Sequence, residues 1–90
     1  MIIKVEQADI DIGVQENTDT CAAARGIQRQ VPGCSGVSVD YDRIEIGYAE
    51  GGSVSVPTPK SVTDFIKIFD DDKDLAKPFE FELPISQENA

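Results

Sequence analysis

The fold is decided by the stretch VTDFIKIFDDDKDLAKPFEFEL, residues 62–83. Its first part repeats apolar side chains at the i, i+3, i+4 and i+7 spacing of one helix face, at Val62, Phe65, Ile66 and Phe69. Its last part, residues 79–83, alternates apolar and acidic side chains, which is the period of a strand with one buried face. Because both elements must bury an apolar face, the stretch predicts a helix that packs on a sheet, with a core centred on Phe65, Phe69, Phe79 and Phe81.

The first third of the chain predicts one strand and one helix. Residues 2–6 predict a strand with an apolar face. The polar residues 9–19 predict a connection, at the end of which Asn17-Thr18-Asp19 offers three good N-cap types in succession. A helix is then predicted from residue 21 to about residue 31, where Pro32 and Gly33 end it.

The middle of the chain predicts an antiparallel meander. Residues 37–41, 44–48 and 54–56 alternate with a period of two and are separated by short turns. After them, Thr58 is a suitable N-cap and Pro59 suits the first position of the second helix, where its missing N–H costs nothing.

The predicted order is therefore β-α-β-β-β-α-β, in a single small α+β domain over residues 1–85. Its two helices are expected to pack on one face of a mixed or antiparallel sheet. Residues 86–90 are predicted to form a frayed tail. A chain of 90 residues with 40% apolar and 28% charged residues has the composition of one globular domain.

The charge of the chain limits the partners it can have. Seventeen acidic residues against eight basic ones give a net charge of −9, and there is no histidine. A field of this sign repels phosphate backbones and anionic lipids, so direct binding to nucleic acid or membrane is disfavoured. No apolar run approaches the roughly 20 residues of a membrane span, and no basic leader precedes the first strand. We therefore expect a cytoplasmic protein.

Cys21 and Cys34 stand at opposite ends of the first predicted helix. Their Cα atoms should be about 15–20 Å apart, whereas a disulfide needs less than about 7 Å. Two thiols without histidine also make a poor zinc site, so no metal or cofactor is expected. The main interpretation is two small buried side chains in a reducing compartment. The alternative is a reactive Cys21 whose pKa the helix N-terminus lowers.

The acidic segment of residues 70–74 is the one motif that suggests a ligand. Asp70, Asp72 and Asp74 match positions 1, 3 and 5 of a calcium loop. The glycine of position 6 is replaced by Leu75 or Ala76, according to how the loop is counted, and the glutamate of position 12 by Phe81. A solvated acidic turn is therefore the main interpretation, and weak cation binding the alternative. Without histidine or a recognisable nucleophile motif, the sequence predicts no enzymatic activity.

The acidic residues favour a protein partner over a small ligand. A solubilising surface is the simplest interpretation, and the sharper hypothesis is a surface that attracts a basic protein. The candidate partner-binding residues are Asp70, Asp71, Asp72, Asp74, Glu80 and Glu82. The alternative function is structural, in which the domain forms a homo-oligomer or joins a larger assembly.

Several short motifs of the chain form a familiar pattern: Ile10-Asp11-Ile12-Gly13, the helix that begins Cys21-Ala22-Ala23-Ala24, Phe-Ile-x-x-Phe-Asp at residues 65–70 and Pro-Phe-x-Phe-x-Leu at residues 78–83. With these motifs the chain resembles a group of small accessory proteins of tailed bacteriophages and prophages. Members of this group often carry Cys-Pro at the helix start, where this chain has Cys21-Ala22. The resemblance implies a phage protein that acts in the host cytoplasm and modulates a host protein, for instance in host takeover or against a defence system. It supplies no catalytic residues.

Overall fold

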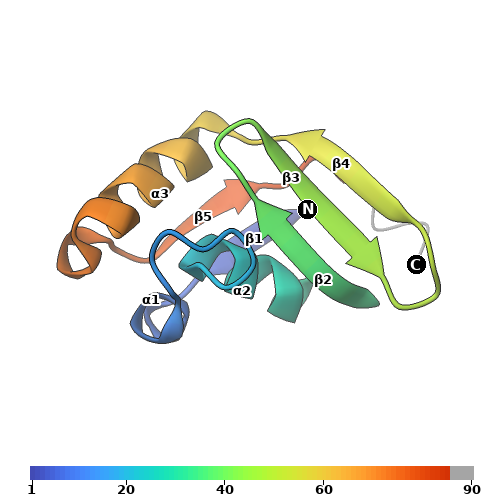
Figure 1. The fold of residues 1–90 in the computed structure, drawn as a ribbon, viewed down its shortest axis with the longest axis horizontal. Coiled ribbons are helices and arrows are strands. Elements are labelled where there is room, and N and C mark those ends of the chain that lie inside the picture. Colours follow the sequence, from blue (N-terminus) through green and yellow to red (C-terminus); the bar gives the residue numbers. More distant parts are fainter. Residues whose placement is uncertain (86–90) are drawn as a thin grey trace.

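The structure is a computed structural model that describes residues 1–85, so the predicted tail, 86–90, lies outside the described residues. The elements in chain order are β1 (Ile2–Val5), α1 (Gln7–Ile12), α2 (Ala22–Gln30), β2 (Cys34–Val39), β3 (Arg43–Tyr48), β4 (Ser53–Pro57), α3 (Lys60–Asp71), the 3-10 helix η1 (Lys73–Leu75) and β5 (Phe79–Glu82). This confirms the predicted α+β class and, apart from α1 and η1, the predicted order (Figure 1).

The strands form two antiparallel sheets rather than one. β1 pairs with β5, with Ile3 opposite Phe81, and β2, β3 and β4 form the predicted meander. The free side of β1 is occupied by a side chain from α2. The Gln30 amide accepts a hydrogen bond from the Lys4 N–H at 2.9 Å and donates one to the Lys4 carbonyl at 2.6 Å. Because Gln30 satisfies both backbone groups, no strand of the meander can pair with β1 there.

Both sheets and the helices share one core. The apolar stripe of α3 is buried as predicted, and Phe69 has no exposed surface. The Phe65 ring stacks on the Phe79 ring at a centroid distance of 4.6 Å, and Phe79 stacks on Phe81 at 5.7 Å. Phe81 is buried, whereas Phe79 is only partly buried. The aromatic contact between α3 and β5 is thus confirmed, with Phe79 at its margin.

Helix α1 occupies part of the predicted connection, so that prediction was wrong. A capping box starts the helix, because the Glu6 N–H donates to the Asp9 carboxylate at 2.9 Å while the Glu6 side chain accepts from the Asp9 N–H. Asp9 is 3% exposed and also accepts a 2.6 Å hydrogen bond from Arg29 of α2. This hydrogen bond raises the pKa of the Arg29 guanidinium. Tertiary contacts with α2 therefore support a helix too short to be stable by propensity alone.

Both helix starts differ from the predicted ones. The N-cap of α2 is Cys21, while the Asn17 carboxamide accepts hydrogen bonds from the N–H groups of Asp19 and Thr20 and closes a turn before the helix. The N-cap of α3 is Pro59 rather than Thr58. The Thr58 hydroxyl instead donates to the Asp40 carbonyl at 2.7 Å, which ties the end of β4 to the hairpin between β2 and β3.

Candidate partner-binding surface

The six predicted site residues lie in two separate places. Residues 70–74 end α3 and begin η1, where Asp71, Asp72 and Asp74 are exposed and Asp70 is half-buried. Glu80 and Glu82 are exposed on β5, which runs away from the end of α3 towards the N-terminus (Figure 1). The Glu82 carboxylate pairs with the ammonium of Met1. The acidic residues therefore do not form one continuous patch.

Two of the predicted aspartates have structural contacts. The Asp70 carboxylate accepts a hydrogen bond from the Glu16 N–H at 2.9 Å, which fixes the loop between α1 and α2 to the end of α3. The Asp72 carboxylate accepts from the Asp74 N–H at 3.0 Å and caps η1. By contrast, the side chains of Asp71 and Asp74 have no hydrogen-bond or ion-pair partner among residues 1–85.

Lys73 is the only basic residue in this acidic segment, and it does not neutralise its neighbours. Its ammonium donates to the backbone carbonyls of Asp11 at 2.9 Å and Gly13 at 2.7 Å, at the C-terminal end of α1. The ammonium also lies 5.7 Å from the centre of the Phe69 ring. Within the described chain, Lys73 forms no ion pair with a carboxylate. The Lys73 ammonium thus binds the end of α1, and the exposed residues Asp71, Asp72 and Asp74 form no ion pair within residues 1–85.

The loop between α1 and α2 is the part of this site that sequence reasoning missed. The Gln15 carboxamide donates to the carbonyl of Phe69 at 2.8 Å and, less closely, to that of Asp70 at 3.3 Å. These carbonyls belong to the last turn of α3, where the helix has no internal donors left. With the Lys73 contacts, these bonds join segments 54 to 62 residues apart. No local pattern in the sequence predicts these contacts between the α1–α2 loop and the end of α3.

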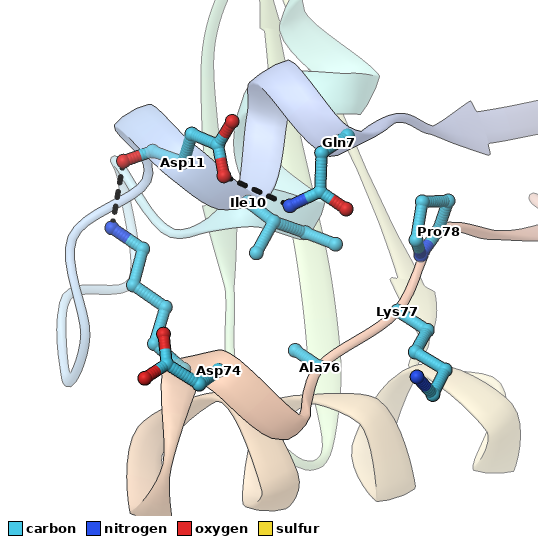
Figure 2. A pocket seen from close by; sticks show the side chains of 8 residues that line it. Gln7, Ile10, Asp11, Asp74, Ala76, Lys77 and Pro78 are labelled. Carbon is cyan, nitrogen blue, oxygen red and sulfur yellow. Dashed lines mark hydrogen bonds between the residues drawn. The ribbon is translucent and has the colours of Figure 1, made fainter.

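An open pocket of about 680 Å³ lies between α1 and the segment that joins η1 to β5. Figure 2 shows Gln7 and Asp11 on one wall, joined by a 2.8 Å hydrogen bond, with Asp74, Ala76 and Lys77 across from them. Ile10 and Ala76 supply apolar surface to the pocket, and both are largely buried. The lining can hydrogen-bond a polar side chain and hold its apolar stem, but it contains no nucleophile beside a base.

Cys21 is buried beneath a smaller hollow of about 270 Å³, whose lining includes Asp70 and Tyr41. Burial raises the pKa of the Cys21 thiol, and the N–H groups of Ala24 and Ala23 at the start of α2 offset only part of this rise. The interpretation of Cys21 as a reactive thiolate is therefore wrong, because desolvation outweighs the helix N-terminus. Both cysteines are free thiols; Cys21 is buried as predicted, whereas Cys34, at the start of β2, is only partly buried, so that part of the prediction was wrong.

Comparison with known proteins adds no assignment, because no family model, curated protein or solved structure matches the chain. In the part of the chain that the structure describes, no three side chains of the metal-binding types gather into a possible site. The helices of that part are also too short or too polar to cross a membrane. The resemblance to phage proteins stays a prediction.

Proposed function

We propose that this chain is a non-enzymatic binding domain that attaches to a basic surface of another protein through the acidic end of α3. Following the resemblance to phage accessory proteins, the partner is a host protein in the cytoplasm whose activity the domain modulates. The centre of the contact is the set Asp71, Asp72 and Asp74. The observation that carries this proposal is the position of Lys73, whose ammonium binds two backbone carbonyls instead of the neighbouring carboxylates.

Electrostatics favours a basic partner at this place. Aspartates that follow one another in the chain repel one another, and within residues 1–85 none of the aspartates 70–74 forms an ion pair. A basic partner would relieve it, and its approach would be steered by the field of a chain with a net charge of −9. Because surface charges are screened over about 8 Å at physiological ionic strength, we expect binding to be fast at low salt and weaker as salt rises.

Glu80 and Glu82 have a different role in the proposal. They belong to β5, away from the aspartates, so they extend the negative field without forming part of the central contact (Figure 1).

A structural role remains the second candidate, because the outer edge of β5 is open. Hydrogen bonds link Met1 with Leu83, and Ile3 lies opposite Phe81, so the backbone groups of Glu80 and Glu82 point away from β1. Within residues 1–85 these groups have no backbone partner outside the strand pair. A second copy could add a strand there, although its own glutamates would oppose the pairing.

The test of the proposed function compares two variants with the same loss of charge. The first replaces Asp71, Asp72 and Asp74 with asparagine, which keeps an oxygen at position 72 to cap η1. The control replaces the exposed residues Asp42, Glu45 and Glu50 of the meander with their amides. Each protein is used to capture partners from a bacterial lysate at low and at physiological salt, with bound proteins identified by mass spectrometry.

We expect the wild type and the control to retain the same basic protein, and the Asp71/Asp72/Asp74 variant to lose it. Equal retention by both variants, with the same salt dependence, would show that the acidic end of α3 is not the contact. Gel filtration at two concentrations tests the structural alternative, since strand addition at β5 produces an oligomer that dissociates on dilution.

A further inference from the structure

We propose that the end of the molecule that carries the aspartates also has an apolar contact surface, which binds a basic amphipathic helix of the partner. The surface consists of Ile12, Val14, Ile68 and Leu75, and we call it the α3-end surface. The inference rests on the proposed function, since it adds an apolar centre to the acidic contact. It makes the partner class more specific, from any basic protein to one with apolar and basic side chains on the same helix.

The first observation is exposure. Ile12 is 60% exposed, Val14 50%, Ile68 48% and Leu75 63%, although large aliphatic side chains are usually buried. Among the described residues, only two other large apolar side chains, Ile2 and Tyr41, are exposed to a similar degree. Single exposed apolar residues are ordinary, but several at one end of a small domain mark a site of interaction.

The second observation is that hydrogen bonds bring these residues to the same end. Ile12 and Val14 flank Gly13, whose carbonyl accepts a hydrogen bond from Lys73 at 2.7 Å. Leu75 follows Lys73 in η1. Ile68 lies in the last turn of α3, where its carbonyl accepts the Asp72 N–H at 2.9 Å. The loop that carries Ile12 and Val14 is therefore held against the end of α3 and the start of η1.

The third observation is charge complementarity. Exposed carboxylates lie next to or between these apolar residues in both segments: Asp11 and Glu16 in the first, and Asp71, Asp72 and Asp74 in the second. A second copy of this chain would bring the same carboxylates together, and an anionic lipid surface would be repelled in the same way. A helix with lysine or arginine beside its apolar face satisfies both the apolar residues and the carboxylates.

The pocket described above adjoins this surface. Two of its lining residues, Asp11 and Asp74, stand next to Ile12 and Leu75 in the sequence. Its apolar part comes from Ile10 and Ala76, and its polar lining carries the carboxylates of Asp11 and Asp74 as well as the basic residues Lys73 and Lys77 (Figure 2). A long basic side chain of the partner can reach the Asp11 or Asp74 carboxylate there, with its methylene stem against the apolar part.

The test uses two synthetic peptides of 18 residues. The first contains leucine and lysine, arranged so that the leucines share one face of a helix. The second has glutamine in place of every leucine, so that the charge is equal and the apolar face is gone. Each is titrated into ¹⁵N-labelled protein, and the backbone amide shifts locate and quantify the binding. We expect the first peptide to shift the amides of residues 12–14, 68 and 75, and the second to bind at least about tenfold more weakly.

Variants of the protein separate the apolar contribution from the charge. Replacing Ile68 and Leu75 with serine should weaken the leucine–lysine peptide about tenfold. The matched control is Ile2→Ser, which removes a side chain of similar exposure, 51%, from the start of β1. It should leave binding unchanged.

The outcomes distinguish the two proposals. If the Ile68/Leu75 variant binds as tightly as the wild type while the Asp71/Asp72/Asp74 variant does not bind, the acidic contact stands and the α3-end surface is refuted. If neither variant weakens binding, both proposals fail. Shifts at other residues would also refute the surface. The same amide shifts on raising the protein concentration without peptide would identify a second copy as the occupant and overturn the proposed partner.

Discussion

Truncation of Phe69 is the most direct test of how the structure is held together. Phe69 is completely buried, its ring stacks on Phe65 at 5.9 Å, and the Lys73 ammonium lies above it. Removing a buried phenylalanine side chain costs about 3–5 kcal/mol. A domain of 90 residues has a total stability of about 5–13 kcal/mol, so Phe69→Ala should remove a large part of it.

The partly buried Phe79 provides the internal comparison. It stacks on Phe65 and Phe81 but keeps some solvent exposure, so Phe79→Ala should cost about half as much as Phe69→Ala. Phe69→Leu, which keeps most of the side-chain volume, should cost about 1 kcal/mol.

Urea unfolding followed by far-UV circular dichroism measures these differences, because the chain has no tryptophan. The midpoint of Phe69→Ala should fall by about 2 M or more at an unchanged slope, unless the variant is already unfolded in water. Equal costs for Phe69→Ala and Phe79→Ala would contradict the difference in burial between the two rings. A Phe69→Ala midpoint close to that of the wild type would refute the core itself.

Three further predictions concern the thiols and one glycine. Cys21 and Cys34 should both react with a thiol reagent in the freshly purified, unfolded protein without prior reduction, and a missing thiol would contradict the two free cysteines. Because burial raises the pKa of the Cys21 thiol, the unfolded chain loses this proton at lower pH than the native one. The free energy of unfolding should therefore fall as pH rises above the ordinary thiol value of 9.0, and less steeply in Cys21→Ala; parallel pH profiles would refute this. Gly13→Ala should lower stability by about 1–3 kcal/mol, because its Cβ would stand 2.7 Å from the Ala22 nitrogen. Gly36→Ala, with open space around it, is the control and should show a much smaller effect in the same thermal melts.

The elements with strong local patterns could be predicted from the sequence. The stripe of α3 and the alternation of β5 are properties of consecutive residues, and both have the predicted buried faces. Helix α1 could not be predicted in this way, because its six residues are supported by Asp9 and its contact with Arg29, 20 positions away. The separation into two sheets depends in the same way on Gln30, whose amide is unremarkable in the sequence and occupies the edge of β1 in the structure.

In the candidate site, too, features of consecutive residues could be predicted, whereas contacts between distant residues could not. The acidic segment of residues 70–74 is a run of charges in the sequence, and a run of charges predicts the exposure that Asp71, Asp72 and Asp74 have in the structure. That Lys73 would bind the end of α1 instead of an aspartate could not be foreseen, because Asp11 and Gly13 come 60 or more residues earlier. Likewise, residues 12–16 have the composition of an ordinary loop, and only the folded chain brings them to the end of α3.

The pairing of β1 with β5 has a consequence for the order of events during synthesis. Val5 pairs with Phe79, 74 positions later, whereas the meander joins strands that are neighbours in the chain. At a translation rate of about 5–20 residues per second, β1 waits roughly 4–15 s for its partner strand to be made. During that time Ile3 and Val5, both buried in the finished fold, have no partner strand to cover them. The nascent chain therefore exposes an unpaired apolar strand that chaperones can bind, and the domain closes only after translation has passed Glu82.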